Sequence, residues 1–130
     1  MEKRVYPVIL SEDGDGGYVV SVPDFRSFTE GKDLADAIYM ARDLIGIMGI
    51  TMQDKNMDIP VPYTEKVEKE NDNDIITLVD IDFEDYRAKH DNRSVRKNCT
   101  IPYYLNEKAE KAGINFSRVL QEALLVRLTQ

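Results

Sequence analysis

Residues 95–120 read VRKNCTIPYYLNEKAEKAGINFSRVL, and their pattern decides the fold of the C-terminal part of the chain. We expect a short strand over 96–101, ended by Pro102, and then a first helix with Leu105, Ala109 and Ala112 at helical spacing. Gly113 suits the position after a helix end, and Asn115 suits the cap of a second helix. The apolar residues of that second helix fall at i, i+3, i+4, i+7 and i+8: Phe116, Val119, Leu120, Ala123 and Leu124.

One strand and two short helices make too small a unit to fold alone, because fewer than about 40 residues seldom build an adequate core. A lone strand also leaves its edge hydrogen bonds unmade. Both problems disappear if two chains pair their strands and interlock their helices. We therefore expect a homodimer, or a tetramer built from it, through residues 95–130.

Alternation along the expected strand assigns its two faces. Cys99 and Ile101 would point to the helices, whereas Arg96, Asn98 and Thr100 would point outward. An antiparallel ribbon fits the DNA major groove, where arginine can pair with guanine, asparagine with adenine, and threonine with a thymine methyl group. The alternative without a DNA-binding role is that these three residues are only the exposed face of an ordinary edge strand.

Here the sequence resembles the ribbon-helix-helix repressors. The resemblance is carried by NCTIP at 98–102 and GINFS at 113–117. It supports DNA readout by the strand residues and a two-fold symmetric operator. The start of the second helix, at Asn115, Phe116 and Ser117, offers free backbone N–H groups to a phosphate.

The preceding 90 residues predict a β-β-β-α-β order and hence an α+β fold. Asp33 is a good N-terminal cap for the helix that follows it. Gly46 and Gly49 lower the helix propensity of its C-terminal half. The polar stretch 54–74, with two prolines, reads as a loop. The expected strands are Val5 to Leu10, Tyr18 to Val22, a short one at Phe28-Thr29, and Ile75 to Phe83. In the last strand, Ile76 and Leu78 lie on one face and Val79 and Ile81 on the other.

Charge divides the chain into two parts with different surfaces. Residues 1–90 carry 10 Lys+Arg and 20 Asp+Glu, whereas residues 91–130 carry 7 Lys+Arg and 4 Asp+Glu. The whole chain, with 42% hydrophobic and 32% charged residues, reads as globular. Because it has a single cysteine, no apolar leader and no long apolar run, we expect a cytoplasmic protein.

The N-terminal part resembles the HicB-type antitoxin family, through YPVI at 6–9, DGDGGYVV at 13–20, VPD at 22–24 and TEGKDLADA at 29–37. The family pairs a partial RNase H-like domain with, in some members, a ribbon-helix-helix module. The resemblance implies an antitoxin that neutralises a small basic HicA-type mRNA-cleaving toxin and represses its own operon. Residues 1–87 would then bind the toxin, 88–94 would be a linker, and 95–130 would bind DNA.

Acidic and aromatic side chains near the turn after the second strand are our candidates for toxin contact: Asp24, Phe25, Phe28 and Glu30. The family often has a Leu-Pro-Gly-Cys-like turn where this chain has Phe25-Arg26-Ser27-Phe28, so the surface there differs in detail.

Two other function classes stay open from the sequence. The first is a repressor whose N-terminal domain binds a small ligand or oligomerises. The second is a divalent-metal nuclease using Asp80, Asp82, Glu84 and Asp85, although four carboxylates in one segment are more often a solvated edge. We expect no enzyme activity, no cofactor and no metal. His90 is the single histidine, so no Cys/His zinc site is available, and the glycine turn at 13–17 reads as a plain hairpin and not a calcium loop. Cys99 reads as a core residue and not a reactive thiol.

Overall fold

A computed structural model describes residues 3–91 and 93–129. The chain divides into two compact units, Met1–Arg93 and Ser94–Gln130, here called unit 1 and unit 2. Unit 1 holds strands β1 (Lys3–Glu12), β2 (Tyr18–Val22) and β3 (Ser27–Gly31), with a short 3-10 turn, η1 (Pro23–Phe25), before β3. Helix α1 (Leu34–Asp54), strand β4 (Ile75–Asp82) and helix α2 (Phe83–His90) follow. Unit 2 holds helices α3 (Tyr103–Lys111) and α4 (Phe116–Leu128).

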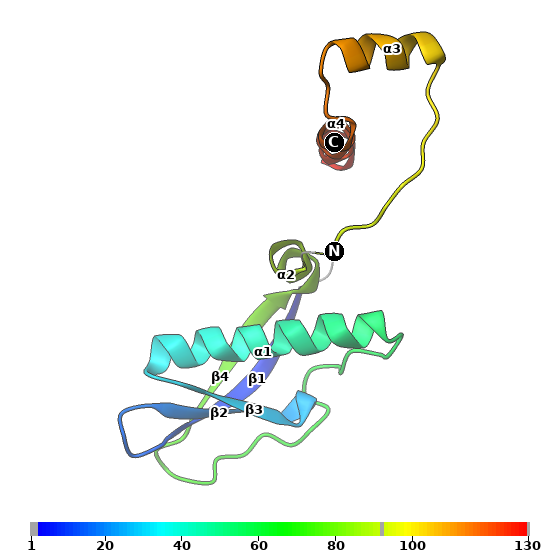
Figure 1. The fold of residues 1–130 in the computed structure, drawn as a ribbon. Coiled ribbons are helices and arrows are strands. Elements are labelled where there is room, and N and C mark those ends of the chain that lie inside the picture. The colour runs from blue at the N-terminus through cyan, green and yellow to red at the C-terminus, as the bar shows by residue number, and fades with distance from the viewer. Residues whose placement is uncertain (1–2, 92, 130) are drawn as a thin grey trace. The chain divides into compact units, whose positions relative to one another are not determined.

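The four strands of unit 1 form one antiparallel sheet in the order β3-β2-β1-β4. Helix α1 lies across one face of this sheet (Figure 1). The core forms between them, from alternate residues of the strands and the apolar side of α1, and Tyr6, Val8, Val20, Ala41 and Ile45 are fully buried. The predicted β-β-β-α-β order is therefore present, with β1 and β3 longer at both ends than expected.

Helix α1 begins where the sequence predicted. The Asp33 side chain accepts a hydrogen bond from the Asp36 backbone N–H at 2.8 Å, and the Asp36 carboxylate in turn accepts one from the Lys32 N–H at 2.8 Å. The first bond satisfies a donor that the first turn of a helix leaves free, and the second fixes the backbone just before the cap. The helix then continues through Gly46 and Gly49 to Asp54 without a break.

Helix α2 was not predicted and explains those two glycines. A Cβ atom at Gly46 would collide with the ring of Tyr86, and one at Gly49 with the ring of Phe83. The glycines thus let α2 approach α1 closely. Phe83, predicted as a strand residue, is the first residue of α2, and residues 88–90, expected in the linker, lie in its last turn.

The loop over 55–74 is held to the rest of unit 1 by specific contacts. The Tyr6 hydroxyl donates to the Pro60 carbonyl at 2.6 Å, and the Arg26 guanidinium pairs with the Glu65 carboxylate at 2.7 Å. Asp24, described below, binds the same loop. Long loops without secondary structure are uncommon in small domains, and these contacts give this one a fixed course.

The two predicted helices of unit 2 are present. The Asn115 side chain caps α4 by accepting a hydrogen bond from the Arg118 N–H at 3.1 Å, and Gly113 has the positive φ, 70°, of a residue that ends a helix. The predicted strand over 96–101 is absent, because residues 93–102 have no regular secondary structure. A strand requires a hydrogen-bonded neighbour, and the described sheet contains only strands of unit 1. Cys99, predicted to face inward, is exposed for the same reason.

No helix in the described part of the chain is both long enough and apolar enough to cross a membrane.

Candidate functional sites

Asp24 and Phe25, two of the four candidate toxin-contacting residues, are buried inside unit 1. The Asp24 carboxylate accepts hydrogen bonds from the backbone N–H groups of Tyr63, Thr64 and Glu65 at 3.0, 2.9 and 3.2 Å, and from the Thr64 hydroxyl at 3.0 Å. Phe25 packs edge-on against Tyr6, with ring centroids 5.0 Å apart. Both side chains therefore hold the loop and the core together.

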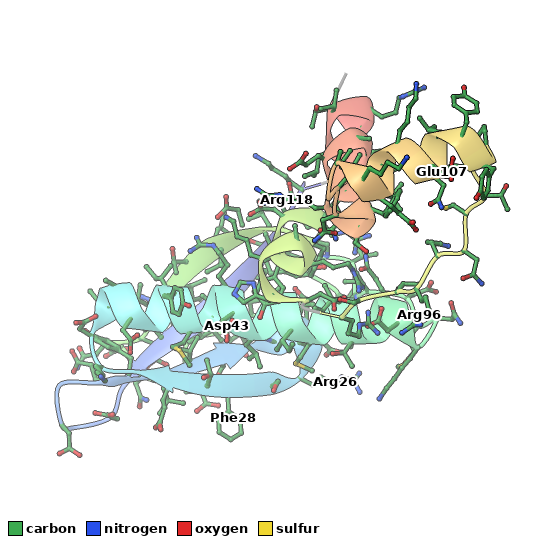
Figure 2. All side chains as sticks on the ribbon, turned by 45° about the horizontal axis from the view of Figure 1, so that its top comes forward. Arg26, Phe28, Asp43, Arg96, Glu107 and Arg118 are labelled. Atoms are coloured by element: carbon green, nitrogen blue, oxygen red, sulfur yellow. The ribbon has the colours of Figure 1, made fainter. Side chains whose placement is uncertain are left out.

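Phe28 and Glu30, the other two candidates, are exposed on the edge strand β3. Phe28 is 73% exposed, more than any other large apolar residue described in unit 1, and it points away from α1 (Figure 2). A shallow hollow of about 330 Å³ lies beside it, lined by Val19, Phe28, Thr29 and Glu30.

Val19, Phe28 and Glu30 belong to the sheet face that α1 does not cover, here called the open face, whereas Thr29 pairs with the core residue Val20. The strand register puts one row of residues across all four strands, in which Phe28 lies opposite Ser21, Ser21 opposite Ile9, and Ile9 opposite Ile76. Val5, Val19 and Leu78 occupy other positions of the same face, and Leu78 is 55% exposed. The sequence placed Ile76 and Leu78 on a different face of the strand from Val79 and Ile81, but no local pattern shows which of the two faces is covered.

A larger pocket, of about 560 Å³, lies where α1, α2 and β4 meet. Four of its charged groups form two ion pairs: Arg42 with Asp80 at 3.0 Å, and Lys89 with Asp85 at 3.0 Å. The Arg42 guanidinium holds the pKa of the Asp80 carboxyl below its usual range. The Tyr86 hydroxyl donates to Asp43 at 2.8 Å. Burial, and then this hydrogen bond, raise the pKa of the Tyr86 phenol.

The carboxylates considered for a nuclease site largely have structural partners. Asp80 and Asp85 are paired as described, and Asp82 caps α2 by accepting a hydrogen bond from the Asp85 N–H at 3.1 Å. Within residues 3–91 and 93–129, no group of three or more potential ligands is placed to hold a metal ion.

The candidate DNA-contacting residues fall into two groups in unit 2. Asn115, Phe116 and Ser117 lie together at the start of α4, where the first backbone N–H groups have no intrahelical partner and the Asn115 side chain accepts that of Arg118. Arg96, Asn98 and Thr100 are exposed in the irregular segment before α3, so no ribbon aligns them in this single chain. The apolar sides of α3 and α4 are exposed as well, including Leu105, Phe116, Val119, Leu120 and Leu124.

Comparison with known proteins identifies the family. The family model for the HicB_like antitoxin of bacterial toxin-antitoxin systems matches residues 6–123. The chain belongs to the HicB-like antitoxin family. The resemblance predicted from the sequence is thereby confirmed, and the match extends over both units.

Two solved structures share the fold of this HicB-like chain. One is a chain of a toxin-antitoxin complex from Streptococcus pneumoniae, 24% identical, covering 97% of this chain and 99% of that chain with a TM-score of 0.57. The other is the antitoxin HicB of Burkholderia pseudomallei, 23% identical, covering 97% of each chain with a TM-score of 0.53. The comparison with curated proteins gave no match.

Proposed function

We propose that this chain is the antitoxin of a type II toxin-antitoxin system, that unit 1 neutralises a HicA-type mRNA-cleaving toxin, and that unit 2 binds operator DNA as a dimer to repress the operon. The observation that carries the proposal is the family match over residues 6–123, because it spans both units. The protein would act by binding, in the cytoplasm, and would have no enzymatic activity of its own. Its unit 1 would be a partial RNase H-like domain.

Charge supports this division of labour. Residues 1–90 have a net charge of -10 and residues 91–130 a net charge of +3. An acidic unit attracts a cationic protein and is repelled by phosphate, whereas a basic unit is attracted to DNA. The toxin would therefore bind unit 1, and the operator would bind unit 2.

Dimerisation through unit 2 is supported by the apolar side chains of its helices that remain exposed. Every described residue from 110 to 129 is exposed, although eight of the 13 residues of α4 are apolar. A second copy could cover these side chains, and its segment 96–101 could supply the hydrogen-bonded neighbour that the first copy's segment needs. Arg96, Asn98 and Thr100 would then lie on one face of a two-stranded ribbon, with Asn115, Phe116 and Ser117 near the phosphates.

The proposal is tested with the product of the reading frame next to this chain, which we expect to be a small basic protein. Expression of that protein alone should arrest growth and cleave mRNA, and co-expression of this chain should restore growth. The same chain should retard the promoter DNA of the pair and leave scrambled DNA of the same length unbound. If the neighbouring protein stays toxic in the presence of folded chain, the neutralising function is wrong.

A further inference from the structure

We propose that the open face of the sheet in unit 1, centred on Phe28 and Leu78, is the surface on which the basic toxin docks. The inference rests on the proposed function and adds where the partner binds. It rests on three observations: the exposed apolar residues of the face, the acidic residues at its rim, and the charge of the unit as a whole.

The open face has the composition of an interface centre. Val5, Val19, Ile76 and Leu78 are between 37% and 55% exposed, and Phe28 is 73% exposed. Exposed apolar residues gathered on one face of a protein often mark an interaction site, and here they flank Pro7, which pairs with Leu78 on the same face and is itself buried. An exposed aromatic beside a hollow, as Phe28 is beside Val19, is the kind of residue that dominates binding energy.

The shape of the face suits a protein rather than a small molecule. Four strands spaced about 4.8 Å apart form a platform roughly 15–20 Å across. The hollow beside Phe28 is shallow and holds one charged group, Glu30. Small-molecule sites are enclosed and have several convergent polar groups, whereas protein interfaces have an apolar centre and a polar rim.

Charge identifies the occupant as a basic protein rather than a second copy of unit 1. Glu30 lies at the β3 edge of the platform, and Asp80 and Asp82 lie at its β4 edge, where Asp80 pairs with Arg42 and Asp82 caps α2. Pairing two open faces would bring together two units with a net charge of -10 each, counted over residues 1–90. Like charges across an interface oppose association, and a partner whose apolar patch is bordered by Lys and Arg would be attracted.

The test is a titration of the full chain with the small basic protein encoded by the adjacent reading frame, separated from the co-expressed complex in denaturant and refolded. Phe28→Ala and Leu78→Lys should each weaken binding at least about tenfold, as expected at the centre of an interface. Tyr39→Ala is the matched control: Tyr39 is an exposed aromatic, 58% exposed, on α1 and therefore on the other side of the sheet, and its loss should change affinity less than about twofold.

A charge variant gives an independent readout. Glu30→Lys should slow association severalfold at low salt, and the difference should shrink as salt is added, because rim charges act mainly on association rates and are screened. All variants should keep the wild-type circular dichroism spectrum, because the replaced side chains are exposed.

The outcomes separate the two proposals. If the wild-type chain does not bind the neighbouring protein, the proposed function fails and the docking surface fails with it. If the wild type binds and Phe28→Ala and Leu78→Lys bind equally well, only the docking surface is wrong. It is also wrong if Tyr39→Ala alone abolishes binding, or if Leu78→Lys lowers the oligomer mass of the free chain, because a second copy would then cover the open face.

Discussion

Asp24 is the residue on which the course of the loop in unit 1 depends most. It is 5% exposed and accepts three backbone N–H groups and one hydroxyl. Asp24→Ala would leave those donors without a partner, at a cost of about 1–3 kcal/mol for each group that water cannot reach. We expect the free energy of unfolding to fall by about 2–4 kcal/mol.

Urea denaturation followed by circular dichroism measures this change. The control is Glu30→Ala, an exposed substitution on β3 that should stay within about 0.5 kcal/mol of wild type. If Asp24→Ala unfolds at the wild-type urea concentration, the loop does not depend on this carboxylate.

Asn98 and Ser117 should affect DNA binding in different ways. Asn98→Ala removes a potential bidentate contact worth about 1–3 kcal/mol of discrimination at one base pair, and a two-fold dimer would lose it in both half-sites. Binding to scrambled DNA should hardly change, because phosphate neutralisation sets it. Ser117→Ala should instead weaken binding to all sequences modestly and evenly.

The measurement is a titration of each variant against operator and scrambled DNA at two salt concentrations. Full operator preference in Asn98→Ala would mean that the outward face of the expected ribbon is assigned incorrectly.

At the level of elements, the packing of α2 on α1 depends on the glycines of α1. Gly49→Ala gains helix propensity, worth up to about 1 kcal/mol, but forces the new methyl group against the Phe83 ring. Overpacking a core typically costs about 1–3 kcal/mol, so we expect a net loss of stability. In the double variant Gly49→Ala with Phe83→Leu, the smaller leucine makes room for the new methyl group. It should recover part of the lost stability in the same denaturation experiment. Equal or higher stability of Gly49→Ala alone would show that α2 moves away without cost.

The C-terminal end of α2 is fixed by a cluster of charges that responds to pH. The Arg93 guanidinium binds both oxygens of Asp91, at 2.9 and 2.8 Å, and Arg87 binds Asp91 and Asp54 at 3.2 and 3.0 Å. The hydrogen bonds from Arg93 hold the pKa of Asp91 well below its usual range. A carboxyl with a lowered folded-state pKa contributes stability above its unfolded pKa of about 3.9, and this contribution is lost as the pH falls below that value.

Asp91→Asn should therefore lower the melting temperature at pH 7, and the difference from wild type should shrink as the pH falls from about 4 towards the lowered pKa. Asp85→Asn, which removes an exposed pair with Lys89, should change the melting temperature little at pH 7. A constant difference between Asp91→Asn and wild type from pH 7 down to pH 2 would contradict the role given to Arg93.

Elements with local signals were predictable from the sequence, and elements that depend on distant contacts were not. Helix α1 has its cap at Asp33 and an apolar side at helical spacing, and both signals are local. Helix α2 follows from Asp82 as a cap and from two rings, of Phe83 and Tyr86, that fit against glycines 34 and 40 residues earlier in the chain. No local window contains that contact.

The candidate toxin-contacting residues show the same limit. Asp24 and Phe25 looked available because they lie beside a turn, but the loop residues 63–65 and Tyr6 cover them. Phe28 follows them by only three positions and is exposed. Which side of the turn faces solvent is decided by a loop about 40 residues further along the chain.

At the level of the whole molecule, each unit should keep its own function when the other is disrupted. Unit 1 has its own buried core, from Tyr6 to Tyr86, whereas the helices of unit 2 leave their apolar sides uncovered. Ile101→Asp, placed on the side expected to face the partner copy, should lower the sedimentation mass of the full chain and abolish operator binding. The circular dichroism of unit 1 should be unaffected, and toxin neutralisation should persist.

The most direct test is the affinity of a chain ending at Arg93 for the small basic protein of the adjacent reading frame, measured by calorimetry beside the full chain. We predict dissociation constants equal within about threefold, together with complete loss of operator binding, because the acidic unit alone carries the toxin surface. A folded chain of residues 1–93 that neither binds nor inhibits this protein would contradict the division of labour between the two units.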